Sequence, residues 1–465
     1  MTNVKYNPED PIAAIATPLS PGALAIVRAS GKNCVQLVSK VFSRPKALLE
    51  AEGNTIVYGW IVEKENADKN GSDNRIDEVL VSVFRAPKSF TGEEMCEISC
   101  HGGVSVVNAV YNLLIKNGFR PAERGEFTFR AYINGKADLT RAEAVREIID
   151  SKTDASRSHA AGRLSGSLFE EIDGIKTLIT DTLAAIEVDI EYPEDEETIA
   201  DSFDQKDLVT ARDRLQSLAD SWKSEKIYQD GAKIVLAGKT NAGKSSLFNA
   251  LLKEDRSIVS DIEGTTRDWI ESWVSFDGIP ARLFDTAGLR KTDDVIEARG
   301  VELTKDIAAT ADLMLYLVDS TKGVSADDIE FVKNNNSIPT VVVFNKIDTS
   351  DKKLEFDGAQ NSVYISAKKG LGLGELTTLV KKILLGSSQV KSSHTGLGSE
   401  RQKQSVCEAL ERVEHALKIA ADGSYGLDAV VQDLEDCLDS LGEVTGQVTP
   451  DDVLGSIFSH FCVGK

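Results

Sequence analysis

The eight residues from Gly238 to Ser245 read GKTNAGKS and fit the phosphate-binding loop pattern GxxxxGK[ST]. An apolar run at 233–237 precedes them and predicts a strand, while the pattern at 246–252 predicts a helix. In this setting, glycines let backbone N–H groups surround phosphates, and the helix N-terminus adds positive potential. The loop therefore predicts a P-loop nucleotide-binding fold, with Lys244 on the β- and γ-phosphates and Ser245 on Mg²⁺.

A second motif indicates which base is bound. The apolar run 340–344 predicts a buried parallel strand, and it ends in Asn345-Lys346-Ile347-Asp348. A carboxylate at Asp348 can accept from the N1–H and 2-amino groups of guanine. Adenine lacks this donor pair and would leave the carboxylate unpaired. The motifs predict GTP contacts from the phosphate loop, the DxxG segment, the NKxD segment and a guanine loop: Asn241, Ala242, Gly243, Lys244, Ser245, Ser246, Asp285, Thr286, Ala287, Gly288, Asn345, Lys346, Asp348, Ser366, Ala367 and Lys368.

The switch elements lie between these motifs. Asp285 follows an expected strand at 281–284 and would hold Mg²⁺ through water, while Thr266 is the natural second hydroxyl on Mg²⁺. The whole set resembles the translation-factor-related class of P-loop GTPases. Leu289 stands where Ras-type enzymes carry a water-orienting Gln. Asn241 with Gly264-Thr265-Thr266 resembles the subclass in which a bound K⁺ replaces an arginine finger, although Asn241 could also merely fill the loop.

Composition bounds the other function classes. The net charge of −21 comes from 53 basic and 74 acidic residues, which argues against an extended nucleic-acid-binding surface. No run of 18 apolar residues predicts a membrane span. The N-terminal residues resemble neither a signal peptide nor a transit sequence, and six scattered cysteines make no disulfide framework. We therefore expect a reducing cytoplasm and no membrane association.

The patterning predicts four regions. Residues 1–133 are mixed α/β, 134–228 helical, 229–385 the GTPase domain, and 386–465 helical again. The simplest architecture is a Ras-like GTPase domain inserted into a discontinuous helical domain and preceded by an α/β domain. Within the helical part, Ala142, Val145, Ile148 and Ile149 are expected to share one face. Thr449-Pro450-Asp451-Asp452 predicts a capped start of a last helix, with Pro450 at the first helical position.

The chain ends in Phe461-Cys462-Val463-Gly464-Lys465. Together with SFTGE at 89–93, HGG at 101–103 and RGEF at 124–127 running to NGK at 134–136, this end resembles the tRNA uridine-modification GTPase family MnmE/TrmE. The resemblance covers essentially the whole chain. It implies a homodimer that forms a heterotetramer with a flavin-dependent partner, MnmG (GidA). Together they would add an aminomethyl or carboxymethylaminomethyl group to carbon 5 of the wobble uridine of certain tRNAs.

The same resemblance implies roles for individual residues. A tetrahydrofolate, in its 5-formyl or 5,10-methylene form, would supply the one-carbon unit in the N-terminal α/β domain. Its site would include Arg28, Glu97, Lys136 and Lys465. Glu297, twelve residues after Asp285, would orient the hydrolytic water. The K⁺ site would comprise Asn241, Ser260, Ile262 and Thr265.

Some interpretations stay open from the residues alone. Cys462 could be a nucleophile toward uracil, a tuner of the active site or a packed thiol. Cys96, Cys100 and His101 have a metal-like spacing, but no second Cys/His pair accompanies them, so no metal is expected there. A regulatory GTPase of ribosome assembly is the alternative function, and a tRNA-binding scaffold without hydrolysis is the third.

Overall fold

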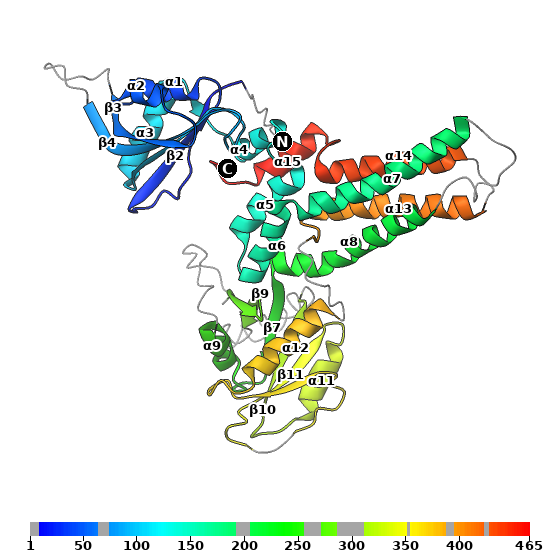
Figure 1. The fold of residues 1–465 in the computed structure, drawn as a ribbon. Coiled ribbons are helices and arrows are strands. Elements are labelled where there is room, and N and C mark those ends of the chain that lie inside the picture. The colour runs from blue at the N-terminus through cyan, green and yellow to red at the C-terminus, as the bar shows by residue number, and fades with distance from the viewer. Residues whose placement is uncertain are drawn as a thin grey trace. The chain divides into compact units, whose positions relative to one another are not determined.

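The computed structural model describes residues 9–63, 74–191, 205–254, 271–285, 311–350, 354–386, 395–422 and 427–465 (Figure 1). Its contacts divide the chain into two compact units, residues 1–146 with 442–465, and residues 147–441. Each unit contains a six-stranded sheet together with helices. The predicted class, α/β combined with helical parts, is confirmed. The four boundaries expected from the sequence stay a prediction.

The sheet of the first unit has the order β3-β4-β5-β2-β1-β6 and is antiparallel except where β6 joins β1. Its strands are β1 (Ile12–Ile15), β2 (Leu24–Ser30), β3 (Thr55–Glu63), β4 (Asn74–Phe84), β5 (Met95–His101) and β6 (Arg120–Pro121). Its first helices are α1 (Cys34–Lys40), α2 (Pro45–Leu49) and α3 (Val104–Lys116). Because side chains alternate along a strand, Val27, Val81 and Ile98 share a core with α1 and α3. Arg28 and Glu97 point to the opposite face.

The chain's C-terminus packs within this first unit. Helix α4 (Glu126–Ile133) contacts α15 (Asp451–Ser459), with the rings of Phe129 and Phe458 edge-to-face at 5.4 Å. Helix α15 begins one residue later than the capping pattern predicted. Pro450 has extended dihedrals and is itself the N-cap, without a side-chain cap. The hydroxyl of Thr449 is buried without a hydrogen bond among the described residues, so its predicted capping role is wrong.

A group of long helices belongs largely to the second unit. They are α6 (Asp154–Ser165), α7 (Ser167–Glu191), α8 (Lys206–Asp230), α13 (Glu400–Asp422) and α14 (Leu427–Thr445), preceded by α5 (Leu139–Asp150). Helices α6 and α8 contact β9 (Ile279–Asp285) of the sheet in this unit. Helix α8 contacts α6, α7 and α13, and His415 of α13 bonds Asp433 of α14. Of the residues expected to share one face of α5, Ala142 is buried, whereas Ile149, in the last turn, is 46% exposed. None of the described helices is long and apolar enough to cross a bilayer.

A buried guanidinium joins three segments of these helices. Arg163 of α6 is 1% exposed and donates to Glu147 at 2.7 Å, to Glu225 of α8 at 2.7 Å and to the Gly396 carbonyl at 3.2 Å. A β-carbon on Gly396 would come within 2.4 Å of Glu225, so this segment packs directly on the ion pairs. Burial alone would raise the pKa of Glu225, but His159 and Arg163 outweigh it and lower that pKa. The network therefore ties α8, which leads into the second sheet, to the segment that follows this sheet.

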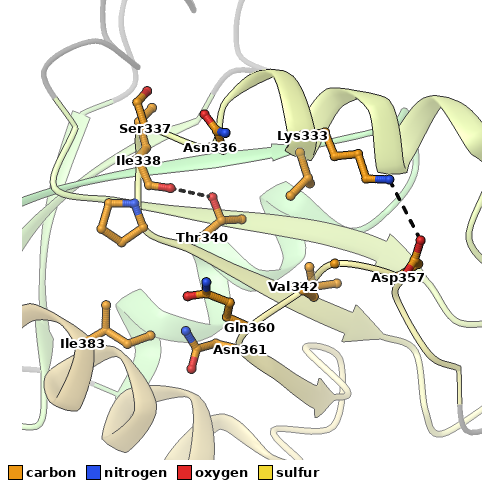
Figure 2. Close-up of a pocket in the computed structure, with 14 residues that line it drawn as sticks. Lys333, Asn336, Ser337, Ile338, Thr340, Val342, Asp357, Gln360, Asn361 and Ile383 are labelled. Carbon is orange, nitrogen blue, oxygen red and sulfur yellow. Dashed lines mark hydrogen bonds and ion pairs between the residues drawn. The ribbon is translucent and has the colours of Figure 1, made fainter.

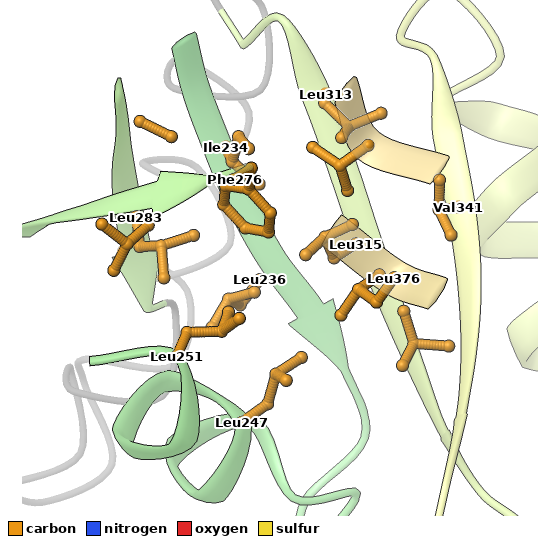
Figure 3. Close-up of a cluster of buried hydrophobic side chains, with 14 of the residues drawn as sticks. Ile234, Leu236, Leu247, Leu251, Phe276, Leu283, Leu313, Leu315, Val341 and Leu376 are labelled. Carbon is orange, nitrogen blue, oxygen red and sulfur yellow. The ribbon is translucent and has the colours of Figure 1, made fainter. Parts of the chain in front are cut away.

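The second sheet has the order β12-β11-β10-β7-β9-β8 and is parallel except for β8. Its strands are β7 (Ala232–Gly238), β8 (Glu271–Phe276), β9 (Ile279–Asp285), β10 (Leu313–Asp319), β11 (Thr340–Asn345) and β12 (Ser362–Ile365). Helices α9 (Lys244–Glu254) and α12 (Leu373–Leu385) cover one face, where Leu236, Leu247 and Leu376 meet in the core of Figure 3. Helix α11 (Ala326–Asn334) covers the other. Parallel strands buried on both faces explain the continuous apolar runs in the sequence.

Replacing Arg163 by methionine should destabilise the helical part by about 3–5 kcal/mol, because the mostly buried Glu147 and the buried Glu225 would both lose their guanidinium partner. Urea unfolding followed by circular dichroism measures this loss. The matched control is Arg157→Met on the same helix, whose ion pair with Asp154 is exposed and contributes less than about 1 kcal/mol.

The ion pair between Arg163 and Glu225 also predicts that the stability of the fold depends on pH. A carboxylate with a lowered folded-state pKa stabilises the fold above its unfolded pKa, and this contribution is lost as the pH falls through the folded value. Lowering the pH should therefore reduce the difference in free energy of unfolding between wild type and Arg163→Met. Equal urea midpoints for Arg163→Met and Arg157→Met at neutral pH would contradict the role given to the network.

Candidate functional site

The phosphate loop leaves the carboxyl end of β7 and enters α9. Gly238 and Gly243 have φ values of 134° and 101°, a region that favours glycine. A β-carbon on Gly238 would lie 2.4 Å from the Leu317 carbonyl of β10, so the loop starts in close contact with the sheet. Lys244 donates to the carbonyls of Gly238 at 2.6 Å and Lys239 at 3.0 Å. Its ammonium is thus already held inside the ring of the loop, as a phosphate ligand requires.

The base-reading segment, residues 345–348, lies at the same edge of the sheet, because β7, β10, β11 and β12 run parallel. Asn345, 2% exposed, donates to the Ala242 carbonyl at 2.9 Å and accepts from the Ala367 amide at 3.0 Å. One buried side chain therefore joins the phosphate loop to the guanine loop, residues 366–368. Figure 3 shows β7 of this sheet running into the phosphate loop beside Leu247.

Asp348 is oriented by the guanine loop. The Ser366 hydroxyl donates to its Oδ1 at 2.7 Å, and Lys369 approaches Oδ2 at 3.9 Å. The Ser366 bond is the main cause that lowers the pKa of Asp348, so this side chain is a carboxylate and an acceptor at neutral pH. Lys368 is exposed next to it. The arrangement can accept two donors of one base edge, which is what guanine offers.

The other expected nucleotide and cation residues divide into two groups. Ser245 and Ser246 lie in the first turn of α9, and Asp285 ends β9 at the carboxyl edge. The remaining predicted residues lie outside the described residues: Ser260, Ile262, Thr265, Thr266, Thr286, Ala287, Gly288 and Glu297. Their roles stay predictions.

Two of the cavities formed by the described residues lie on the second sheet. One, of about 430 Å³, is lined by Gly238, Lys239, Asp319 and neighbouring residues beside the phosphate loop. The other, of about 510 Å³, is shown in Figure 2, where Thr340 and Asn361 mark the amino ends of β11 and β12. Parallel α/β sheets bind ligands at the carboxyl ends of their strands. The nucleotide site is therefore assigned to the edge that carries the first cavity.

A second cluster lies in the first unit. Arg28 donates to Glu97 Oε1 at 2.7 Å and 3.0 Å, and to the Gly464 carbonyl at 3.0 Å. Its guanidinium also lies 5.5 Å from the ring centre of Phe90 and 5.6 Å from that of Phe127. Two predicted folate residues are thus paired with each other, and the chain's last residues reach them. This cluster has aromatic surface, a cation and an anion within one small region.

The remaining expected folate residues lie near this cluster. Lys136 packs beside Gly92, two residues from Phe90, and Lys465 follows Gly464 directly. Cys462 is exposed, while its carbonyl accepts from the Gly125 amide. An exposed thiol disfavours the packed-thiol interpretation but does not decide between the other two.

The Cys96, Cys100 and His101 motif is divided between the two sheet faces. Cys96 and Cys100 point into the core, where burial raises the pKa of Cys100 to about 11. His101 instead bonds Asp77 at 2.8 Å, and this bond raises its pKa. Alternation along β5 therefore separates the motif's thiols from its imidazole. The described part of the chain contains no group of three or more His, Cys, Asp or Glu suited to a metal.

Comparisons with known proteins cover nearly the whole chain. The family model of the MnmE helical domain matches residues 139–462, and that of the GTP-binding protein TrmE N-terminus matches residues 11–136. The chain belongs to the MnmE/TrmE family. The tRNA modification GTPase MnmE of Treponema denticola is 52% identical over 99% of both chains. That of Borrelia turicatae is 40% identical over 100% of both.

The resemblance inferred from the motifs is thereby confirmed. Among solved structures, Aquifex aeolicus Era bound to GDP.AlF4- is 28% identical and covers 39% of this chain and 66% of that one, with a TM-score of 0.27. This similarity adds nothing to the MnmE/TrmE assignment.

Sequence reasoning missed three residues of these sites. Asp319, at the end of β10, pairs with Lys346 at 2.6 Å, and Phe90 and Phe127 flank Arg28. A carboxylate that ends an apolar strand at the carboxyl edge was a signal that could have identified Asp319. The two aromatic residues lie inside the SFTGE and RGEF segments, but only the fold brings them together.

In this MnmE/TrmE chain, Asp348→Asn should weaken GTP binding by about 10²–10⁴-fold, because two bonds to a charged acceptor are lost. Xanthine nucleotides, which present an acceptor in place of the 2-amino group, should then be preferred. Competition binding with GTP and XTP measures both effects. Asp357→Asn, an exposed carboxylate in the segment before β12, is the control, and unchanged GTP affinity in Asp348→Asn would rule out the assigned base contact.

Proposed function

We propose that this GTPase of the MnmE/TrmE family acts in tRNA modification by adding an aminomethyl-type group to carbon 5 of the wobble uridine. A flavin-dependent partner would share the reaction, and a tetrahydrofolate would supply the one-carbon unit. The observation that carries the proposal is the bond from Arg28 to the Gly464 carbonyl. It places the CxGK terminus, residues 462–465, in contact with a cluster that a GTPase does not need for GTP hydrolysis.

The residues around Arg28 suit a folate. Both Arg28 bonds to Glu97 end on Oε1, and no described residue bonds Oε2, which leaves an acceptor for the donors of a pterin edge. Cations at Lys136 and Lys465 suit the glutamate tail. A β-carbon on Gly464 would come within 3.1 Å of the Ala16 Cα, so the terminal segment lies close against the sheet. These observations support the assignment of Arg28, Glu97, Lys136 and Lys465 to one site.

The residues to which we assign GTP binding and hydrolysis belong to the second unit. Lys244, Ser245 and Asp348 would bind Mg²⁺-GTP, with Thr266 as a second hydroxyl on the metal. We propose that K⁺ is held by Asn241, Ser260, Ile262 and Thr265, and that Glu297 orients water. Asn241 has a left-handed φ of 65° in the phosphate loop, and asparagine tolerates this conformation well.

We also propose a homodimer formed through the first unit. The sheet face opposite α1 and α3 carries exposed apolar side chains: Leu24, 69% exposed, Ile56, 65%, Tyr58, 48%, and Leu80, 47%. Tyr58 and Leu80 are direct cross-strand partners on this face. A two-fold axis would place this strip against its own copy, which buries it on both subunits. Sedimentation of the whole chain as a monomer would contradict this arrangement.

A regulatory GTPase of ribosome assembly is the alternative. It would need the guanine-nucleotide site but neither the Arg28–Glu97 pair nor the contact with Gly464. The pure tRNA-binding scaffold requires no phosphate-loop lysine held in place, whereas Lys244 is held by two carbonyls.

Loss of the chain should remove the 5-aminomethyl-type nucleosides from tRNA, as measured by mass spectrometry of wobble uridines. Arg28→Ala should fail to restore them although its GTP hydrolysis stays normal, because Arg28 lies in the other unit. Arg44→Ala, on an exposed arginine of the same unit, is the matched control and should restore them. An unchanged nucleoside profile without the chain would favour ribosome assembly.

GTP hydrolysis should be about 10–100-fold faster in K⁺ than in Na⁺, since a fixed cation between the phosphates stabilises the developing charge. Glu297→Ala should bind GTP normally and lower kcat about 10²-fold. Single-turnover rates in the two salts separate these effects. Equal hydrolysis rates in K⁺ and Na⁺ would count against the assignment of Asn241 to a K⁺ site. A wild-type rate for Glu297→Ala would exclude Glu297 from the mechanism.

A further inference from the structure

Asp319 is a buried carboxylate at the carboxyl edge of the second sheet. It ends β10, is 7% exposed, and lies beside Asn345 in the parallel register of β10 with β11. Its Oδ1 accepts from the Thr321 amide at 3.0 Å and the Thr321 hydroxyl at 2.6 Å. Its Oδ2 accepts from the Lys346 ammonium at 2.6 Å. Both oxygens are therefore fixed, and one of them is directed at the base-reading segment.

Lys346 passes this constraint to the phosphate loop. Its ammonium also donates to the Asn241 carbonyl at 2.8 Å, and its own amide donates to Asn345 Oδ1 at 2.8 Å. The next carbonyl of the loop, that of Ala242, accepts from Asn345 at 2.9 Å. Two successive carbonyls of the phosphate loop are thus held by two successive side chains of the base-reading segment.

The phosphate loop and the base-reading segment are in tight contact. A β-carbon on Gly243 would lie 2.1 Å from Asn345 Nδ2, so the Asn345 side chain packs directly against the backbone of the phosphate loop there. Asn241 and Lys346 both have left-handed backbones, with φ of 65° and 70°. Such conformations persist where surrounding bonds determine them. A bond on the Asn241 carbonyl therefore restrains the backbone from which the Asn241 side chain extends.

The charge of Asp319 makes this brace strong. Burial opposes ionisation of Asp319, but the bonds from Lys346 and Thr321 outweigh it and lower its pKa. At neutral pH a carboxylate therefore faces an ammonium at 2.6 Å, and charge-assisted bonds are about twice as strong as neutral ones. An amide at this position would keep the shape and lose the charge.

We propose that Asp319 is a positioning residue that holds Lys346 on the Asn241 carbonyl and so couples guanine recognition to the cation-binding part of the phosphate loop. The cation part of this inference rests on the proposed K⁺ site, whereas the nucleotide part does not. Without the carboxylate, Lys346 would lose its fixed orientation and Asn241 would lose the restraint on its carbonyl.

Asp319→Asn tests the proposal in the full-length chain. GTP affinity should fall about tenfold, and the K⁺ concentration for half-maximal stimulation should rise about tenfold, because one charge-assisted bond is lost. The rate at saturating GTP and K⁺ should stay near the wild-type rate, since Asp319 contacts no reacting atom. Thr321→Val removes one donor to the same carboxylate and should give a smaller change in the same direction. Asp357→Asn, an exposed carboxylate that pairs with Lys333 and not with the phosphate loop, should change neither constant.

A double-mutant cycle of Asp319→Asn with Lys346→Met separates positioning from general stability. If Asp319 acts through Lys346, the double variant should be no worse in GTP affinity than Lys346→Met alone. Additive losses would overturn the proposal, as would wild-type constants in Asp319→Asn. If the wild type shows no K⁺ preference, the K⁺ site fails, but the affinity arm still decides the role of Asp319. Circular dichroism establishes that each variant is folded, and Thr321→Val replaces Asp319→Asn if the latter is not.

Discussion

The parallel pairing of β10 with β7 and β11 is the constraint on which the nucleotide site depends. Because all three strands end at one edge, residues more than a hundred positions apart in sequence become hydrogen-bonding neighbours, as Asn345 and Ala242 do. No single loop carries the site. Each loop is held by the others, and the close approach at Gly243 is possible only because glycine has no side chain. A change in the register of β11 would displace both base-reading residues and both carbonyls that they hold.

A second constraint comes from inserting one fold within another. The chain must leave the helices at the end of α8 and return just before α13, so these two points must lie close together. Arg163 meets this need with bonds to Glu225 of α8 and to Gly396 of the returning segment. A buried charge cluster is a weak source of net stability. Its geometric demands nevertheless specify one arrangement of three segments, since a shift of any one of them breaks its bond to Arg163.

Much of this was accessible from the sequence. The continuous apolar runs predicted β7 and β11 to within a residue or two, and the described residues of the phosphate-loop and NKxD motifs lie at one edge of the sheet. Local rules failed where the outcome depended on distant partners. Thr449 has good capping chemistry, but α15 starts after Pro450. Ile149 fits the apolar face of α5, yet it lies in the last turn, where the helix is exposed. Burial of Asp319 and pairing of Arg28 with Glu97 needed tertiary contacts that no local pattern encodes.

The two sites differ in how completely each is assembled by the described chain. In the nucleotide site, Lys244 and Asn345 bond carbonyls and amides of neighbouring loops, so their orientation is set by backbone that the sheet already holds. The Arg28 cluster depends instead on residues from both ends of the chain, because Gly464 supplies an acceptor to a strand near the N-terminus. Any displacement of α15 would withdraw that carbonyl and carry Cys462 and Lys465 with it. The position of α15 against α4 therefore controls whether the Gly464 carbonyl reaches Arg28, and the contacts of Phe458 with Phe129 and Tyr132 help to hold that position.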